Sequence, residues 1–266
     1  MPRSEPKSHG LMPMFINAIP AIGAVAGLFL AWEAYVLISG ISPTTLPAPS
    51  RVVAQTVEHR AALATNTLAT IRATVFGFAT SLTAAFLFSV LIDFYGPLRR
   101  ALFPVLIITQ TLPLVAIAPL IVLWFGFGLT PKIMLVALVT FFPMLVALVE
   151  GYRSTSKDLE DLLVSMNAPR HKIFLMARLP SALPYFFAGL RISITYAVVA
   201  AIFAEYAGAV QGLGIYILNA KNNFRPDLVL AAVLVSSTLT LALFGAIVLI
   251  QRLSTPWTRL EGDKAK

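Results

Sequence analysis

The chain has 266 residues, of which 58% are hydrophobic and only 12% charged, with a mean hydropathy of +0.83. A soluble domain carries about 25% charged residues, so most of these apolar side chains must face lipid or another apolar subunit. The formal net charge of +8 suggests the positive-inside bias of a membrane chain rather than nucleic-acid binding, and the absence of cysteine excludes disulfides, thiolate metal sites and cysteine catalysis.

Six segments are long and apolar enough to cross about 30 Å of hydrocarbon, which takes roughly 20 residues each. They cover residues 14–39, 67–92, 101–125, 132–149, 184–207 and 228–250. A tail of residues 1–13 precedes this transmembrane domain (14–250), and a tail of residues 251–266 follows it. The predicted fold class is an all-α polytopic membrane protein with six transmembrane helices.

The orientation of the spans follows from the Lys and Arg residues between them. Thirteen fall on the side of the N-terminus and six on the opposite side, with Arg191 set aside because it lies inside the fifth span. Cytoplasmic loops carry an excess of Lys and Arg, so both termini are predicted to be cytoplasmic.

The first long loop, residues 40–66, is predicted to lie outside. It opens with a proline-rich turn over residues 42–50. Ser50 is of the residue type that accepts a hydrogen bond from the start of a helix, which predicts that Ser50 caps a short helix running through His59.

The second long loop, residues 150–183, is cytoplasmic in this topology and is the most polar stretch of the chain. Thr155 or Ser156 can cap a helix there, and Asp158 and Asp161 fall in its first turns, where the helix dipole favours anions. Asn167 tolerates the left-handed conformation that ends a helix, and Pro169 prevents its continuation. The pattern predicts a short helix over residues 157–167.

One side of this short helix is apolar. The residues spaced i, i+3, i+4 and i+7 are Leu159, Leu162, Leu163 and Met166. The stripe needs a partner, and three are open: the protein's own helix ends, the lipid interface, or another subunit.

The same loop resembles the cytoplasmic signature of ABC-importer permeases. That signature reads Glu-Ala-Ala, three residues, Gly, nine residues, Ile, one residue, Leu-Pro. Asp161 falls at the Glu position, Asn167 at the Gly and Leu179-Pro180 at the terminal pair, with the spacing kept. The departures are Leu162 and Leu163 for the two alanines, Asn167 for Gly and Ala177 for Ile.

Further stretches extend the resemblance over about residues 43–250. They are the lead-in at 42–50, the third span and its exit at 112–120 and 124–128, and the fifth span with its loop at 183–184, 189–191, 204–205 and 212–214. Together they resemble the permeases for nitrate, sulfonate, taurine, riboflavin and thiamine precursors, which have the type I importer (MetI-like) fold.

The resemblance implies a permease subunit in a bacterial inner membrane that takes a small solute from an extracytoplasmic binding protein. It also implies a second permease copy, with a homodimer favoured, and two ATPase subunits in the cytoplasm. The coupling helix that docks on the ATPase would comprise Asp158, Leu159, Asp161, Leu162, Leu163, Met166, Asn167 and Ala168. The chain has no G-x-x-x-x-G-K-[ST] phosphate loop, so ATP and Mg²⁺ would bind to the partner, and the chain itself would have no cofactor, metal site or catalytic residue.

Four polar residues within the spans are candidates for the translocation pathway. Thr109 and Gln110 either line a cavity or hydrogen-bond to neighbouring helices and to the carbonyl freed by Pro113. Glu205, beside Tyr206, either lines the pathway or is a helix-end acid paired with a neighbouring base.

The substrate is the least determined property. Apart from Arg191, no basic residue lies deep in a predicted span, which favours riboflavin or a thiamine-precursor pyrimidine slightly over an anion of the nitrate, sulfonate or taurine type. The alternative function is an ion-coupled secondary transporter, which predicts inverted repeats and acidic clusters within the membrane.

Overall fold

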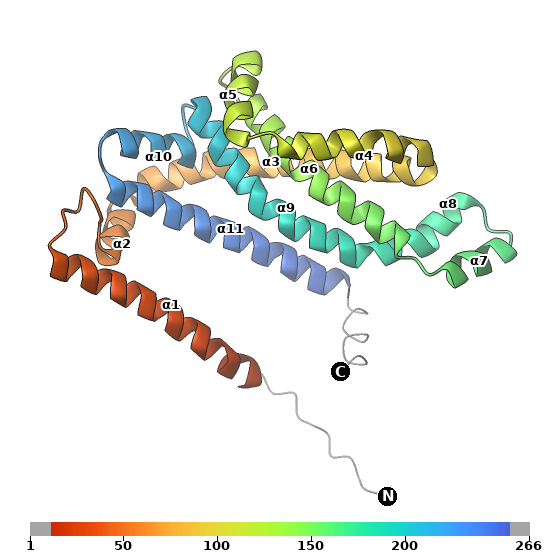
Figure 1. The fold of residues 1–266 in the computed structure, drawn as a ribbon, viewed down its shortest axis with the longest axis horizontal. Helices are drawn as coiled ribbons and strands as arrows, with labels where there is room; N and C mark the ends of the chain where they lie inside the picture. Colours follow the sequence, from red (N-terminus) through yellow and green to blue (C-terminus); the bar gives the residue numbers. More distant parts are fainter. Residues whose placement is uncertain (1–11, 256–266) are drawn as a thin grey trace, which may run out of the picture.

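The computed structural model describes residues 12–255, and every regular element in this range is a helix (Figure 1). In chain order the elements are α1 (Met12–Ser39), α2 (Pro49–Glu58), α3 (Arg60–Phe94), α4 (Gly96–Thr111), α5 (Leu114–Phe125), α6 (Thr130–Arg153), α7 (Lys157–Ser165), α8 (Arg170–Ile173), the π-helix η1 (Phe174–Arg178), α9 (Leu179–Gly208), α10 (Leu213–Asn222) and α11 (Pro226–Ser254). Of the predicted tails, 1–13 and 251–266, only residues 12–13 and 251–255 are among the described residues.

The long helices agree with a polytopic membrane protein. Four stretches are long and apolar enough to cross a membrane: α3, α6, α11 and the continuous rod Arg170–Gly208 that α8, η1 and α9 form. The bent pair of α4 and α5 makes a fifth. Helix α1, with 28 residues, is long enough for a further span. The arrangement is consistent with six spans.

The third predicted span, 101–125, is not one straight helix. Helices α4 and α5 meet at a bend of 100°, and Figure 1 shows α5 turned away from the line of α4. Leu112 has an extended backbone (φ −73°, ψ 128°) directly before Pro113. A residue before proline avoids the helical region, and proline lacks the N–H that would continue the helix, so the span breaks there.

Most of the residues 49–66 are helical. Helix α3 begins at Arg60, seven residues before the predicted start of the second span, and only His59 separates it from α2. The prediction that Ser50 caps α2 is wrong: Pro49 takes the first turn, and the cap position falls on Ala48. Ser50 instead donates from its N–H (3.0 Å) and hydroxyl (2.6 Å) to the Glu33 carboxylate, which ties α1 to α2.

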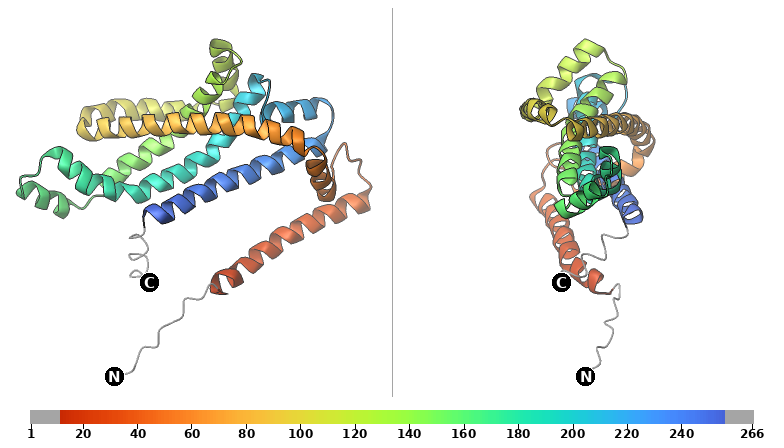
Figure 2. Two further views of the ribbon diagram at one scale, coloured as in Figure 1. Left: turned by 180° about the vertical axis from the view of Figure 1, so that it is seen from behind. Right: turned by 90° about the vertical axis from the view of Figure 1, so that its right-hand side faces the viewer.

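The core lies where α9 packs against α6 and α6 against α3, the two largest helix interfaces. Met144 and Leu145 of α6 and Ala197 and Ala201 of α9 are fully buried there. Small residues let the backbones approach closely, as is usual between membrane helices. Figure 2 shows the elongated bundle that results, with α7 and α8 at one end and α2 and α10 at the other.

A pair of glycine substitutions tests the close approach of α6 and α9. An added Cβ at Gly189 would collide with Ala147 Cβ, whereas one at Gly245 of α11 would meet nothing within 4 Å. We expect Gly189→Ala to destabilise the purified protein by about 1–3 kcal/mol through overpacking. Gly245→Ala should be neutral or stabilise it by up to about 1 kcal/mol, because alanine favours helix. Thermal unfolding of both variants measures the difference, and equal melting temperatures would contradict the packing described.

The candidate coupling site and translocation cavity

Helix α7 begins as its sequence predicts. Of the two possible caps, Ser156 is the one used: its Oγ accepts a hydrogen bond from Leu159 N (3.2 Å). Asp158 and Glu160 occupy the first turn, where the positive end of the helix dipole stabilises their charges. These local interactions fix the start of a nine-residue helix that is too short to span the membrane.

The end of α7 depends on Asn167. Its φ of +58° is left-handed, and its N–H donates to Val164 O (2.8 Å). The N–H of Ala168 donates to Leu163 O (3.0 Å). This pair of bonds is the Schellman arrangement that ends a helix, and asparagine tolerates the left-handed conformation better than most residues other than glycine. Asn167 therefore performs the task expected of a glycine at this place.

The apolar stripe of α7 lies largely open. Leu162 is 56% exposed and Met166 71% exposed, Leu159 and Val164 are exposed as well, and Leu163 is half-buried. Asp158, Asp161 and Asn167 are exposed beside them, while Ala168 is half-buried. Three of the four stripe residues thus lie outside the chain's own packing, which disfavours the protein's own helix ends as the partner of the stripe.

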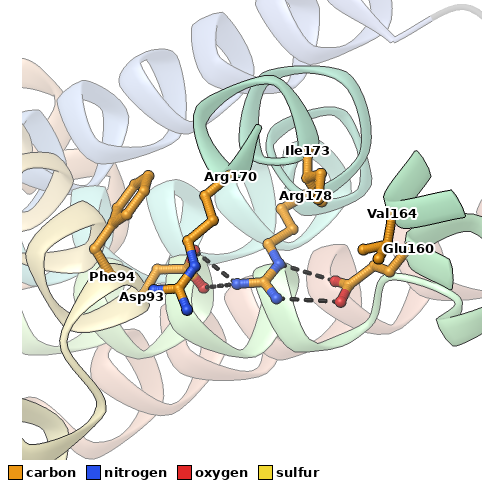
Figure 3. A pocket seen from close by; sticks show the side chains of 7 residues that line it. All are labelled: Asp93, Phe94, Glu160, Val164, Arg170, Ile173 and Arg178. Atoms are coloured by element: carbon orange, nitrogen blue, oxygen red, sulfur yellow. Dashed lines mark hydrogen bonds and ion pairs between the residues drawn. The ribbon is translucent and has the colours of Figure 1, made fainter. Parts of the chain in front are cut away.

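A single guanidinium holds α7 to the membrane helices (Figure 3). Arg178 donates from Nε (2.8 Å) and Nη2 (3.1 Å) to the two carboxylate oxygens of Glu160 on α7. From Nη1 it donates to both carboxylate oxygens of Asp93, each at 2.9 Å, at the end of α3. We call these three residues the Arg178 fork. Within the described residues, it makes the only side-chain hydrogen bonds between α7 and another helix.

The fork borders a cavity of about 320 Å³ between α3, α7 and the α8–η1 segment. Phe94, Val164 and Ile173 form its apolar wall, and Arg170 points into the same space (Figure 3). The sequence did not single out Arg178, Asp93 or Glu160 as a unit. Asp93 and Arg178 are 85 positions apart, and no local pattern joins them.

The ends of α3 and α6 that lie near the fork are tied to each other and to η1. Tyr152 of α6 and Ser89 of α3 share a hydrogen bond of 3.0 Å between their hydroxyl oxygens. The Tyr152 ring lies edge-to-face on Phe174 of η1, with 5.1 Å between the centroids. These contacts give the segment beside α7 a closely packed base.

A second cavity, of about 520 Å³, lies beside the break between α4 and α5. Its wall comprises Thr109, Gln110, Leu112, Leu114, Ile117, Leu138, Val139, Pro143, Ile192, Tyr196 and Val199. No charged residue is among them. Thr109 donates to Leu106 O of its own helix (2.7 Å), whereas Gln110 is exposed to the cavity.

The structure places Glu205 and Tyr206 elsewhere. Neither lines the cavity beside Gln110. Glu205 is fully buried and accepts hydrogen bonds from Thr70 Oγ1 (3.0 Å) and Gly214 N (2.9 Å). Tyr206 accepts a hydrogen bond from Lys221 Nζ (3.4 Å). The four candidate pathway residues thus form two separate groups.

Long apolar helices, together with a short helix that exposes an apolar stripe at one end, agree with the permease subunit of a transport system. Residues 77–259 match the model of the family described as binding-protein-dependent transport system inner membrane component, and the chain belongs to this family. It is an ABC-importer permease, a multi-pass inner-membrane component and not an enzyme; its ATPase is a separate chain. Membership disfavours the ion-coupled secondary transporter.

Three relatives are similar over almost their whole length. The formylaminopyrimidine transport permease ThiX of Halalkalibacterium halodurans is 34% identical, covering 87% of this chain and 93% of the relative. The riboflavin transport system permease RibX of Chloroflexus aurantiacus is 34% identical, covering 90% and 91%. The taurine transport system permease TauC of Escherichia coli is 30% identical, covering 92% of each.

The contribution of the fork to the stability of α7 can be tested without a transport assay. Arg178→Ala removes four charge-assisted hydrogen bonds, each worth about 1.5–3 kcal/mol. We expect amide hydrogen exchange in residues 157–165 to accelerate by about tenfold or more, since 1.4 kcal/mol already gives a factor of ten.

The matched control is Arg153→Ala. Arg153 makes an exposed ion pair with Glu150 at 3.4 Å, the kind that contributes little to stability. Mass spectrometry should show unchanged exchange in α7 for this variant. Equal protection of α7 in the wild type and in Arg178→Ala would refute the role of the fork.

Proposed function

We propose that α7 with Asn167 and Ala168 is the coupling helix, and that its exposed stripe inserts into a cleft on the ATPase. The observation that supports this most is a helix that is capped at both ends, tied by Arg178 to α3, and yet leaves Leu162 and Met166 open. Burying two such side chains contributes about 1.5–3 kcal/mol each. The fork then transmits the displacement of α7 to the spans.

The cavity beside Gln110 is proposed as one half of the translocation pathway. Its wall is open, and Ile192, Tyr196 and Val199 present an exposed apolar face of α9 along it. A second copy of the chain, placed against this face, would close the cavity and cover these residues. This supports the homodimer, with Thr109 and Gln110 near its centre.

The proposed orientation puts both termini in the cytoplasm. The excess of Lys and Arg on the N-terminal side supports it. The arrangement of the helices agrees: α11 runs from beside α10 toward the α7 end, and α1 runs beside it, with its start away from α2 near the middle of the long axis (Figures 1 and 2). The α7 end would face the ATPase, and the α10 end would face the binding protein.

ATP and Mg²⁺ are proposed to bind only to the partner ATPase, because the chain lacks a phosphate-binding loop. The nucleotide would shift the permease between its inward-open and outward-open arrangements by binding one of them more tightly. The chain contributes the docking helix and the pathway, and the chemical step takes place on the partner.

For the solute, we propose a neutral heteroaromatic molecule of the pyrimidine or flavin class. The cavity offers the Gln110 amide, the Thr109 hydroxyl and the phenol ring of Tyr196, with no basic side chain to hold an anion. Two of the relatives reported above are named for transport of formylaminopyrimidine and riboflavin. A taurine-type anion is the next candidate, since a third relative is named for taurine.

Charge on the stripe should prevent docking. The double variant Leu162→Glu/Leu163→Glu places two carboxylates where the apolar contact is proposed, and burying an unpaired charge is strongly unfavourable. We expect the partner ATPase to be lost during co-purification, or its activity to become independent of the binding protein. Val210→Glu, an exposed apolar residue at the opposite end, is the control and should leave the complex intact. Normal co-purification and stimulation of the double variant would contradict the coupling assignment.

The solute class is tested by uptake into vesicles that contain the permease, its ATPase and its binding protein. Competition by formylaminopyrimidine or riboflavin should suppress uptake of the labelled solute, and taurine in equal excess should not. Strict preference for taurine or nitrate would overturn the proposal for a neutral solute while leaving the coupling helix unaffected.

A further inference from the structure

The backbone N–H groups at the start of helix α10 are hydrogen-bonded to side chains of other helices. The first N–H groups of a helix have no partner within it and must be satisfied from outside. Here the N–H of Gly212 donates to Asn66 Oδ1, that of Leu213 to Thr70 Oγ1 and that of Gly214 to Glu205 Oε2, each at 2.9 Å. Two of these acceptors belong to α3 and the third to α9, so α10 is capped entirely by its neighbours.

Two further bonds close the arrangement. Thr70 Oγ1 donates to Glu205 Oε2 (3.0 Å), which joins α3 to α9. Lys132 of α6 donates from Nζ to Gln211 O (3.0 Å), just before α10. We call Asn66, Thr70, Lys132 and Glu205 the α10 seat. It links α3, α6, α9 and α10 at the end of the molecule opposite α7 (Figure 1).

The glycines at the start of α10 are required by this close contact. Gly212 has a φ of +142°, which side chains rarely adopt, and an added Cβ would collide with the Glu205 carboxyl group. An added Cβ at Gly214 would collide with Ile202 O. The Gly-Leu-Gly sequence at 212–214 therefore lets the backbone of α10 rest directly on Glu205.

The seat is buried, which makes its bonds costly to break. Glu205, Thr70 and Leu213 are fully buried, and Lys132 is nearly so. Leaving a buried donor or acceptor without a partner has a large desolvation penalty. An ionisable group within a membrane span is also costly, so its presence indicates a structural or functional role. Glu205 does not line the cavity beside Gln110, so contact with the solute there is not that reason.

We propose that Glu205 is a positioning residue that locks α10 to α3 and α9, so that the outer ends of α3, α6, α9 and α10 move as one rigid unit during transport. This inference rests on the proposed function, in which these helices reorient. The α4–α5 break at Pro113 lies outside the seat and is left free to change its angle. Tightly packed units shift as bodies rather than deform continuously.

The absence of cysteine in the chain allows a direct test, because two introduced cysteines can be spin-labelled without background. Thr65 of α3 and Asn219 of α10 are exposed and lie outside the seat. Their label-to-label distance is measured by pulsed electron paramagnetic resonance in the complete transporter, without nucleotide and with trapped ATP. The inference predicts one narrow distribution, the same in both states.

Substitutions in the seat should broaden this distribution. We expect Glu205→Ala to raise the detached population of α10 about tenfold, the factor that loss of a helix cap or a buried hydrogen bond typically gives. Glu205→Gln keeps both the shape of the side chain and an oxygen that accepts from Gly214 N, and should restore most of the narrow population. Glu205→Met, close in size but without a carbonyl oxygen, should not, which separates the hydrogen bonds from the bulk of the side chain. Thr70→Val, close in shape and lacking the hydroxyl, keeps the question testable if Glu205→Ala does not fold.

Glu58→Ala is the matched control, since Glu58 is an exposed acid that accepts a hydrogen bond from Gln55 on its own helix. The inference is overturned if the wild-type distance changes between the two states, or if both Glu205→Ala and Thr70→Val leave the distribution as narrow as Glu58→Ala does. Failure of the unlabelled chain to bind an ATPase would instead overturn the proposed function. In that case, the widths of the distance distributions of the variants, compared in the nucleotide-free chain, would still test the seat.

Discussion

The Arg178 fork is the interaction that joins α7 to the long helices of the bundle. A guanidinium presents its donors in a fixed plane, and Arg178 uses both edges: one on Glu160 of α7 and one on Asp93 of α3. Without these hydrogen bonds, α7 would be held to the rest of the protein mainly by the chain connection through Asn167 to α8. With them, a helix outside the membrane is mechanically part of the rod that continues as α9.

Polar interactions are concentrated at the two ends of the bundle. The fork and the Tyr152–Ser89 bond lie at the α7 end, and the α10 seat at the other. Between them the core of α3, α6 and α9 is mainly apolar and closely packed, with a few buried hydroxyls such as that of Ser193, which donates to Thr140 O (3.1 Å). This distribution follows from the bilayer, where an unsatisfied polar group is expensive and packing of small residues holds helices together. It also makes the three helices a stiff connection between the two ends.

The sequence was most informative where interactions are local. The start of α7 at Thr155 or Ser156 and its end at Asn167 were predicted because capping involves residues three or four positions apart, and Ser156 is the cap in the structure. Helix α10 was missed because it is capped by Asn66, Thr70 and Glu205, which are distant in sequence. Pro113 was noted within the third span, but the 100° bend depends on how α5 packs against α6 and α9. The fork escaped prediction for the same reason as α10, since its members lie on three different elements.

The most direct test of the account is ATP-dependent solute uptake by vesicles carrying the complete transporter with Arg178→Ala in the permease. If the fork transmits the movement of the coupling helix, the ATPase should remain bound and hydrolyse ATP while uptake is largely lost. Uptake at the wild-type rate, with the complex intact, would contradict the claim that the fork connects the ATPase to the pathway.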